Sequence, residues 1–177
     1  MTTMSDWFVD QNRLGKLYTA TNQAGATVTL INTSTTTGFV LSNPWGSGKK
    51  LVVKDAVFAY TTVPAAAAVV FLATSIAVSS VAHATTTALT VYKADSSGPA
   101  GGDSVARVYS VSTTPNLPVY TRILGYSPTT PATTGGLTFK DDINGAMILV
   151  PGSYVQVSYI TTAPVGITTM TWAEVDE

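Results

Sequence analysis

Apolar and polar residues alternate along much of this chain. Residues 27–32 alternate in this way, and the clearest strand covers residues 51–60, in which Val53 and Val57 share one face while Val52 and Phe58 share the other. A period of two places successive side chains on opposite faces of a β-strand. Shorter runs that we also interpret as strands cover residues 27–32, 38–42, 67–73, 76–81, 88–93, 106–111, 120–125, 147–150, 154–161 and 167–174.

Residues typical of turns separate these runs. Gly, Pro, Ser and Asn gather at 43–48, 96–103, 127–136, 151–152 and 163–164. Many short strands with such turns between them are typical of a sandwich or a barrel, and no window of about a dozen residues has the 3.6-residue period of a helix. We predict an all-β fold, an antiparallel β-sandwich formed by a single domain over residues 25–177.

Residues 1–24 do not fit this alternation. Their polarity is mixed, and Trp7 and Phe8 stand next to each other among polar residues. We interpret the segment as an extended N-terminal arm or a first edge strand, with a frayed terminus as the alternative. Exposed aromatic side chains mark contact surfaces, so we expect the arm to dock on another protein.

An uncharged stretch extends from residue 56 to residue 92, and its part at 64–84 is mostly apolar. A transmembrane helix needs about 20 strongly apolar residues. Here Thr74, Ser75, Ser79 and His83 interrupt the stretch, and β-branched residues dominate among the larger ones. We therefore predict two buried strands, 67–73 and 76–81, that pair with each other across a Ser-rich turn, and no membrane association.

Charged residues are scarce. They form 11% of the chain, and nine basic residues against ten acidic ones give a net charge of −1. Nucleic-acid binding needs a basic surface, so no nucleic-acid partner is expected. Weak charge also leaves little repulsion between copies, which favours a homo-oligomer or a docked protein. The absence of cysteine excludes disulfides and thiolate chemistry, and the first residues lack the pattern of a signal peptide. We expect folding in a reducing cytoplasm.

The sequence Gly-Ser-Gly-Lys-Lys at 46–50 is similar to the end of a phosphate-binding loop. That motif needs a glycine where Asn43 stands, Ser or Thr where Lys50 stands, and a helix after it. A strand is expected instead. We therefore interpret Asn43, Pro44, Gly46 and Gly48 as a structural turn whose glycines adopt positive φ.

Other groups able to carry chemistry are sparse. His83 is the single histidine and has no acidic neighbour in sequence, so we interpret it as a turn or interface residue. The acidic segment 141–145 lacks the spacing of a calcium loop and is interpreted as a hairpin turn in which Gly145 has positive φ. We expect no enzyme activity, no catalytic residue, no cofactor and no metal.

Four segments together suggest a family. Residues 37–53 contain Asn-Pro-Trp-Gly-Ser-Gly-Lys-Lys-Leu, residues 149–155 contain Pro-Gly-Ser, and residues 171–175 form an aromatic and acidic final strand. These segments, and residues 13–18 in style, resemble structural proteins of tailed bacteriophages. The resemblance implies a jelly-roll β-sandwich that decorates or cements a capsid, often as a trimer.

The expected function is therefore that of a structural virion protein. It would be made in the host cytoplasm and sit on the capsid surface, with the major capsid protein and two further copies of itself as partners. Trp7, Phe8, Trp45 and Trp172 are the candidate interface anchors. The alternative is a glycan- or receptor-binding module of a phage tail fibre or spike, which would use the loops 96–103 and 127–136. A β-sandwich lyase or glycosidase is a third, less favoured hypothesis.

Overall fold

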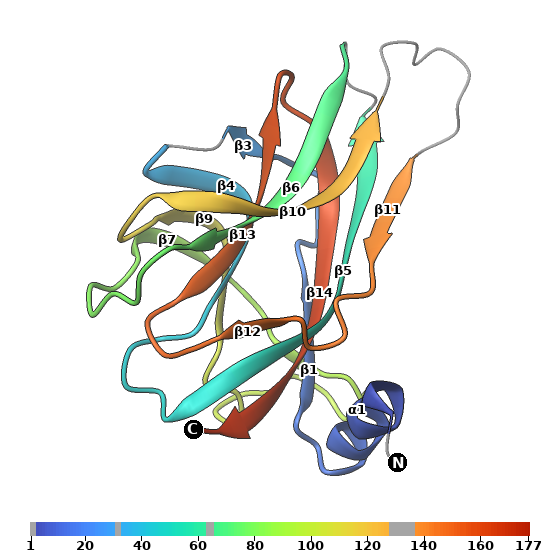
Figure 1. Cartoon of the computed structure of the whole chain (residues 1–177), viewed down its shortest axis with the longest axis vertical. Coiled ribbons are helices and arrows are strands. Elements are labelled where there is room, and N and C mark those ends of the chain that lie inside the picture. Colours follow the sequence, from blue (N-terminus) through green and yellow to red (C-terminus); the bar gives the residue numbers. More distant parts are fainter. Residues whose placement is uncertain (1–2, 31–32, 63–65, 128–136) are drawn as a thin grey trace.

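The computed structural model describes residues 3–30, 33–62, 66–127 and 137–177, which form two packed β-sheets and one helix (Figure 1). Sheet A contains, in spatial order, β11 (Thr138–Asp141) with β12 (Met147–Leu149), β5 (Lys49–Thr62), β14 (Val165–Asp176), β1 (Leu17–Thr21) and β8 (Tyr92–Lys93); β2 (Ala26–Thr27) also pairs with β14. Sheet B contains β10 (Pro118–Ser127), β6 (Ala68–Ser75), β13 (Tyr154–Ile160), β4 (Thr35–Ser42), β9 (Arg107–Thr113) and β7 (Ala84–Leu89); β3 (Thr29–Leu30) also pairs with β13.

The strand order is that of a jelly roll. Eight main strands remain if β11 and β12 count as one and the short or inserted strands β2, β3, β7, β8 and β9 are set aside. Sheet A then has β1, β14, β5 and β11–β12 side by side, which are the first, eighth, third and sixth main strands of the chain. Sheet B has β4, β13, β6 and β10 side by side, which are the second, seventh, fourth and fifth. Neighbouring strands run antiparallel except at the short pairing of β3 with β13. The predicted all-β jelly-roll sandwich is confirmed.

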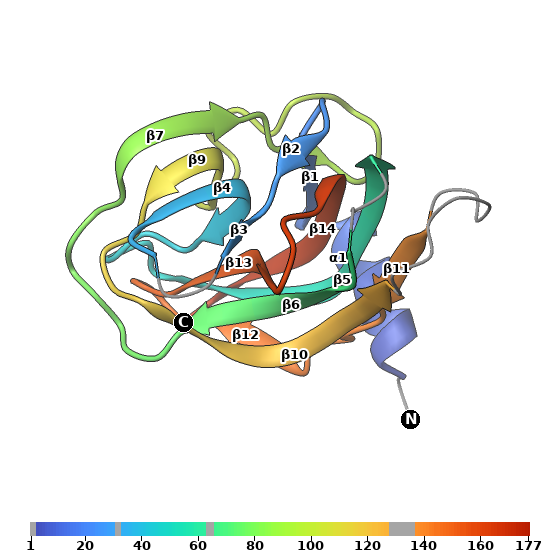
Figure 2. The ribbon, with the colours of Figure 1, turned by 90° about the horizontal axis from the view of Figure 1, so that it is seen from above.

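The two sheets enclose a single large core. Seen from above, β4, β9 and β7 lie on one side of the molecule and β1, β14 and β5 on the other (Figure 2). The strand alternation sends Trp172, Phe39 and Phe58 between the sheets, where each is fully buried. Trp172 is therefore a core residue and not the interface anchor that the sequence suggested, because its position on the inward face of β14 covers it with both sheets.

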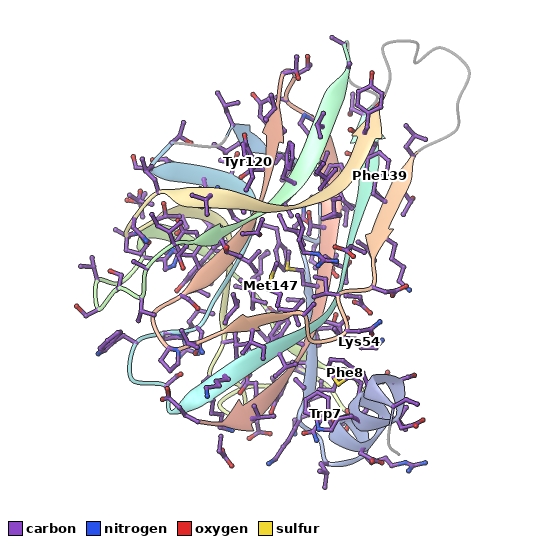
Figure 3. All side chains as sticks on the ribbon, viewed as in Figure 1. Trp7, Phe8, Lys54, Tyr120, Phe139 and Met147 are labelled. Atoms are coloured by element: carbon purple, nitrogen blue, oxygen red, sulfur yellow. The ribbon has the colours of Figure 1, made fainter. Side chains whose placement is uncertain are left out.

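The N-terminal segment is not an extended arm; its first part is a helix, and only its end is a strand, β1, which lies between β14 and the two-residue β8 near the edge of sheet A. Residues Met4–Arg13 form a helix, α1, whose capping box joins Thr3 and Asp6 reciprocally. Figure 3 shows Trp7 and Phe8 on the side of α1 that faces the sheet. Phe8 is only 1% exposed and packs against the outer face of sheet A. The chain then continues into β1, which pairs with β14 over its whole length.

The apolar stretch after β5 also differs from the expectation. Residues 68–75 form β6, which lies between β10 and β13. Residues 76–81 form no strand and leave Ile76, Val78 and Val81 exposed, so the predicted pairing of 67–73 with 76–81 is wrong. The chain instead crosses to β7 at the far edge of sheet B. The described residues contain no helix that is long and apolar enough to cross a membrane.

Candidate binding surface

The turn between β4 and β5 is built around a buried asparagine. The side-chain amide of Asn43 donates to the backbone oxygens of Lys49 at 2.7 Å and Leu149 at 2.9 Å. Gly46 and Gly48 have φ of 74° and 68°, which confirms the structural turn that the sequence predicts. The strand β5 begins at Lys49, so this turn does not lead into a helix as a phosphate-binding loop does.

Trp45 stands at the tip of this turn between Pro44 and Gly46, with 60% of its surface exposed. The edge of the indole lies against Gly152: a Cβ on that glycine would be 2.7 Å from Cε3 of Trp45 and 2.8 Å from Val78. The close approach holds the indole in place although solvent reaches most of it. Of the four candidate interface residues, Trp45 is the exposed one; Trp7 is partly buried, and Phe8 and Trp172 are buried.

A hollow of about 360 Å³ opens on one side of Trp45. We call it the Trp45 pocket. Besides Trp45 it is lined by residues of the segment 79–83, by Arg107 and Tyr109 of β9, and by Gly152. These residues come from four separate parts of the chain. The pairing of β4 with β9 places Arg107 beside Ser42, and the crossing from β6 to β7 adds the segment 79–83.

His83 forms part of the wall of the Trp45 pocket. Its Nδ1 is 2.6 Å from Oγ of Ser112, and its ring lies 5.3 Å from the ring of Tyr109 and 5.2 Å from that of Tyr154. Burial lowers the pKa of His83 from 6.5 to about 4. The ring is therefore neutral at pH 7, a state in which it neither repels nor attracts an ion by net charge.

Arg107 supplies the positive charge of the pocket. Its Nη1 donates to the backbone oxygens of Val105 and Ala106 at 3.4 and 3.2 Å. Over the described ranges, which include every acidic residue of the chain, no carboxylate lies within 4.0 Å of its guanidinium. The side chain is exposed, so its charge is free to face a ligand.

A second hollow of about 460 Å³ lies between strands of the two sheets. We call it the edge cleft. It is bounded by the end of β6 with residues 76–78, by β10, and by β12 with the residues that follow it. Ile76, Val78 and Ile148 line it with exposed fractions of 69%, 45% and 52%. Arg122 of β10 also lines it and forms a two-point ion pair with Asp141 of β11, at 2.6 and 2.9 Å.

The acidic segment 141–145 is a turn, but not a hairpin. The strands β11 and β12 before and after it both pair with β5, so the segment is an outward bulge within one interrupted edge strand. Asn144 and Gly145 have φ of 47° and 81° and donate their amides to Lys54 and Val53. In the part of the chain that the structure describes, no three His, Cys, Asp or Glu residues gather as metal ligands would.

The two loops considered for glycan binding have different outcomes. The loop 96–103 folds back on β8 through a 2.6 Å ion pair between Lys93 and Asp103 and a bridge between Tyr92 and Pro99. It lies outside both the Trp45 pocket and the edge cleft. Residues 128–136 of the second loop lie outside the described residues.

Sequence reasoning missed the role of Glu174. This carboxylate is 1% exposed and accepts hydrogen bonds from the hydroxyl of Ser104 at 2.6 Å and from the amides of Val105 and Ala106 at 3.1 and 3.3 Å. It thus fixes the start of β9, the strand that carries Arg107 and Tyr109. Its position in the sequence was a signal. One of only two Glu residues stands inside a predicted strand, and a carboxylate there needs hydrogen-bond donors from elsewhere in the fold.

No family model matches this chain, and no curated protein or solved structure matches it either. The jelly roll hosts capsid proteins, lectins and cupins alike, and a fold alone does not define a function. The functional argument therefore depends on the two hollows and on the side chains around them.

Proposed function

We propose that this chain is a structural protein of a virus particle, a capsid decoration or cement protein of the tailed-phage type that works as a homotrimer. In this proposal the edge cleft receives the neighbouring copy, and the assembled trimer attaches to the major capsid protein. The observation that carries it is the group of exposed apolar side chains, Ile76, Val78 and Ile148, around the cleft.

The edges of the sheets support this assignment. Within the described residues, no strand pairs with the outer side of β10 or of β12. Unpaired edge strands present backbone donors and acceptors to a second chain. A cleft between two such edges, lined by Ile76, Val78 and Ile148 beside polar residues such as Thr121, offers both hydrogen bonds and apolar contact to one partner.

The charges around the cleft support it as well. Arg122 is the one charged residue among those that line it, and Asp141 already neutralises it. Burying the cleft therefore removes no unpaired ion from water, which would be costly. With a net charge of −1, three copies also repel each other little.

Sedimentation equilibrium of the purified protein tests the self-association. We expect a trimer at concentrations of about 10–100 μM, and a monomer for Ile76→Asp and Ile148→Asp, because each places an unpaired carboxylate in the contact. Leu14→Asp is the matched control, since Leu14 at the end of α1 is 66% exposed, close to the 69% of Ile76, but lies outside the cleft. A wild-type monomer at all concentrations, or a trimer that survives both cleft variants, would contradict the proposal.

The location on a capsid needs a separate test. Gold-labelled antibodies against the purified protein should label the heads of phage particles from cultures that carry this gene. Label confined to tails would overturn the assignment to the capsid, and particles without label would overturn the assignment to the virion.

A further inference from the structure

We propose that the Trp45 pocket binds an acidic saccharide, a pyranose that bears a carboxylate. This binding function goes beyond the proposed structural role and depends on a different part of the surface. The pocket has about 360 Å³ of space and walls from four chain segments, a size that fits one sugar ring and its substituents.

The aromatic side chains of the pocket suit a sugar ring. The indole of Trp45 is 60% exposed but is held against Gly152 and Val78, so stacking on it costs little conformational entropy. Tyr109 lies in the same wall. A flat aromatic ring with a large apolar face and a polar edge packs well against the C–H face of a pyranose.

Several of the remaining lining residues are polar and uncharged. Ser42, Ser79 and Ser80 are among them, and a hydroxyl both donates and accepts hydrogen bonds, as sugar hydroxyls do. The Nδ1 of His83 is engaged with Ser112. Among the described residues no hydrogen bond reaches Nε2, which leaves that nitrogen for a ligand hydroxyl.

Arg107 selects for the acidic group. It is the one charged residue among those that line the pocket, and no carboxylate of the described ranges neutralises it. A guanidinium binds a carboxylate through two parallel hydrogen bonds. Its Nε and Nη2 make no hydrogen bond within the described ranges, whereas Nη1 is anchored to the backbone of the two residues before β9. The guanidinium is therefore anchored through Nη1, while Nε and Nη2 can donate to a carboxylate.

Titrations with N-acetylneuraminic acid, glucuronate and galacturonate test the proposal, with galactose and glucose as neutral probes and acetate as a carboxylate without a ring. Tryptophan fluorescence and saturation-transfer NMR report binding. Trp172 is buried and Trp7 partly buried, so quenching should come from Trp45. We expect a Kd of about 1 mM for at least one acidic sugar, and roughly tenfold weaker binding of neutral sugars and acetate.

Variants distinguish binding in the Trp45 pocket from binding elsewhere on the surface. Arg107→Gln should weaken acidic-sugar binding roughly tenfold and remove the preference over neutral sugars, while Trp45→Ala should remove binding. Arg13→Gln removes an exposed cation on α1 and should leave binding unchanged. Ile148→Asp, which tests the edge cleft, should also leave it unchanged, so the failure of one proposal is distinguishable from that of the other. Absence of saturable binding, or equal binding of acetate and of acidic and neutral sugars, would overturn the inference.

Discussion

The sequence predicts both Phe8 and Trp45 as interface anchors, yet the fold buries Phe8 and leaves Trp45 exposed. Phe8 lies on α1, to the right in Figure 1, and the domain covers it. Trp45 lies in the turn from β4 to β5, to the left, and solvent reaches 60% of it. The neighbouring residues decide the difference. A capped helix can lay one face on a sheet, whereas a turn between Pro44 and Gly46 holds its middle residue away from the core.

Among single substitutions, the comparison makes its largest prediction for the stability of the domain. Phe8→Ala should lower the free energy of unfolding by about 3–4 kcal/mol, because it removes a buried aromatic ring and leaves a cavity between α1 and sheet A. Trp45→Ala should lower it by less than about 0.5 kcal/mol, because the side chain is mostly solvated. Urea denaturation followed by circular dichroism measures both. Similar losses in the two variants would show that Trp45 belongs to the fold as much as Phe8 does.

The same contrast changes the expectation for a truncation. An extended arm could be removed without cost, but deleting residues 1–12 strips most of α1 from the outer face of sheet A. The apolar surface of Leu17, Val52 and Ala173 would then face water. We expect a loss of stability at least as large as that of Phe8→Ala, and an unchanged thermal midpoint would contradict the docked helix.

The sequence predicts the sandwich because strand alternation is a local property. Residues 51–60 contain three Val, Phe58 and Tyr60, residue types that favour strands, and lie within β5, and Gly46 and Gly48 mark the turn before it. The helix was also readable. Thr3 and Asp6 form a capping box, and Met4, Trp7 and Phe8 have the i, i+3, i+4 spacing of one helix face. The scarcity of Glu and Lys in the chain as a whole obscured this local signal.

The candidate sites were much less predictable. Trp45, His83 and Arg107 are separated by tens of residues. The pairing of β4 with β9 brings Arg107 near the turn of Trp45, and the crossing from β6 to β7 adds His83. The apolar character of Ile76 and Val78 favours a buried strand in the sequence. They are exposed because their segment pairs with no strand and runs over the surface toward β7.

The third prediction concerns the residue that packs against Trp45. Gly152→Ala should lower the free energy of unfolding by about 2 kcal/mol, since Gly152 has φ of 83° and its new methyl group would overlap Trp45 and the backbone oxygen of Ser79. Gly101→Ala is the control, because Gly101 has a positive φ of 57° but open space around it. The emission of Trp45 should shift in Gly152→Ala alone. Equal losses in the two variants would show that backbone strain alone destabilises Gly152→Ala and that the contact with Trp45 adds nothing.

The fourth prediction uses pH. In the unfolded chain His83 has a pKa of about 6.5, whereas burial lowers the pKa of His83 to about 4 in the folded protein. Stability is thus complete above pH 6.5 and falls as the pH decreases toward 4, because only the unfolded state takes up the proton in that interval. Since solvent reaches part of the ring, we expect His83 to contribute a loss of about 1–2 kcal/mol. His83→Gln should lack this part of the pH dependence in urea titrations, and parallel curves would contradict it.

The smallest effect is expected in the turn that presents Trp45. Gly46 and Gly48 have positive φ but open space around the position of a Cβ, so Gly46→Ala and Gly48→Ala suffer backbone strain without a clash. Each should lower the free energy of unfolding by about 1 kcal/mol. Asn tolerates this conformation better than Ala, so Gly46→Asn and Gly48→Asn should recover part of the loss. If Ala and Asn were equally destabilising, the side chain itself would be the problem and the strain argument would fail. If neither had an effect, the turn would not depend on its glycines, and the exposed position of Trp45 would need another cause.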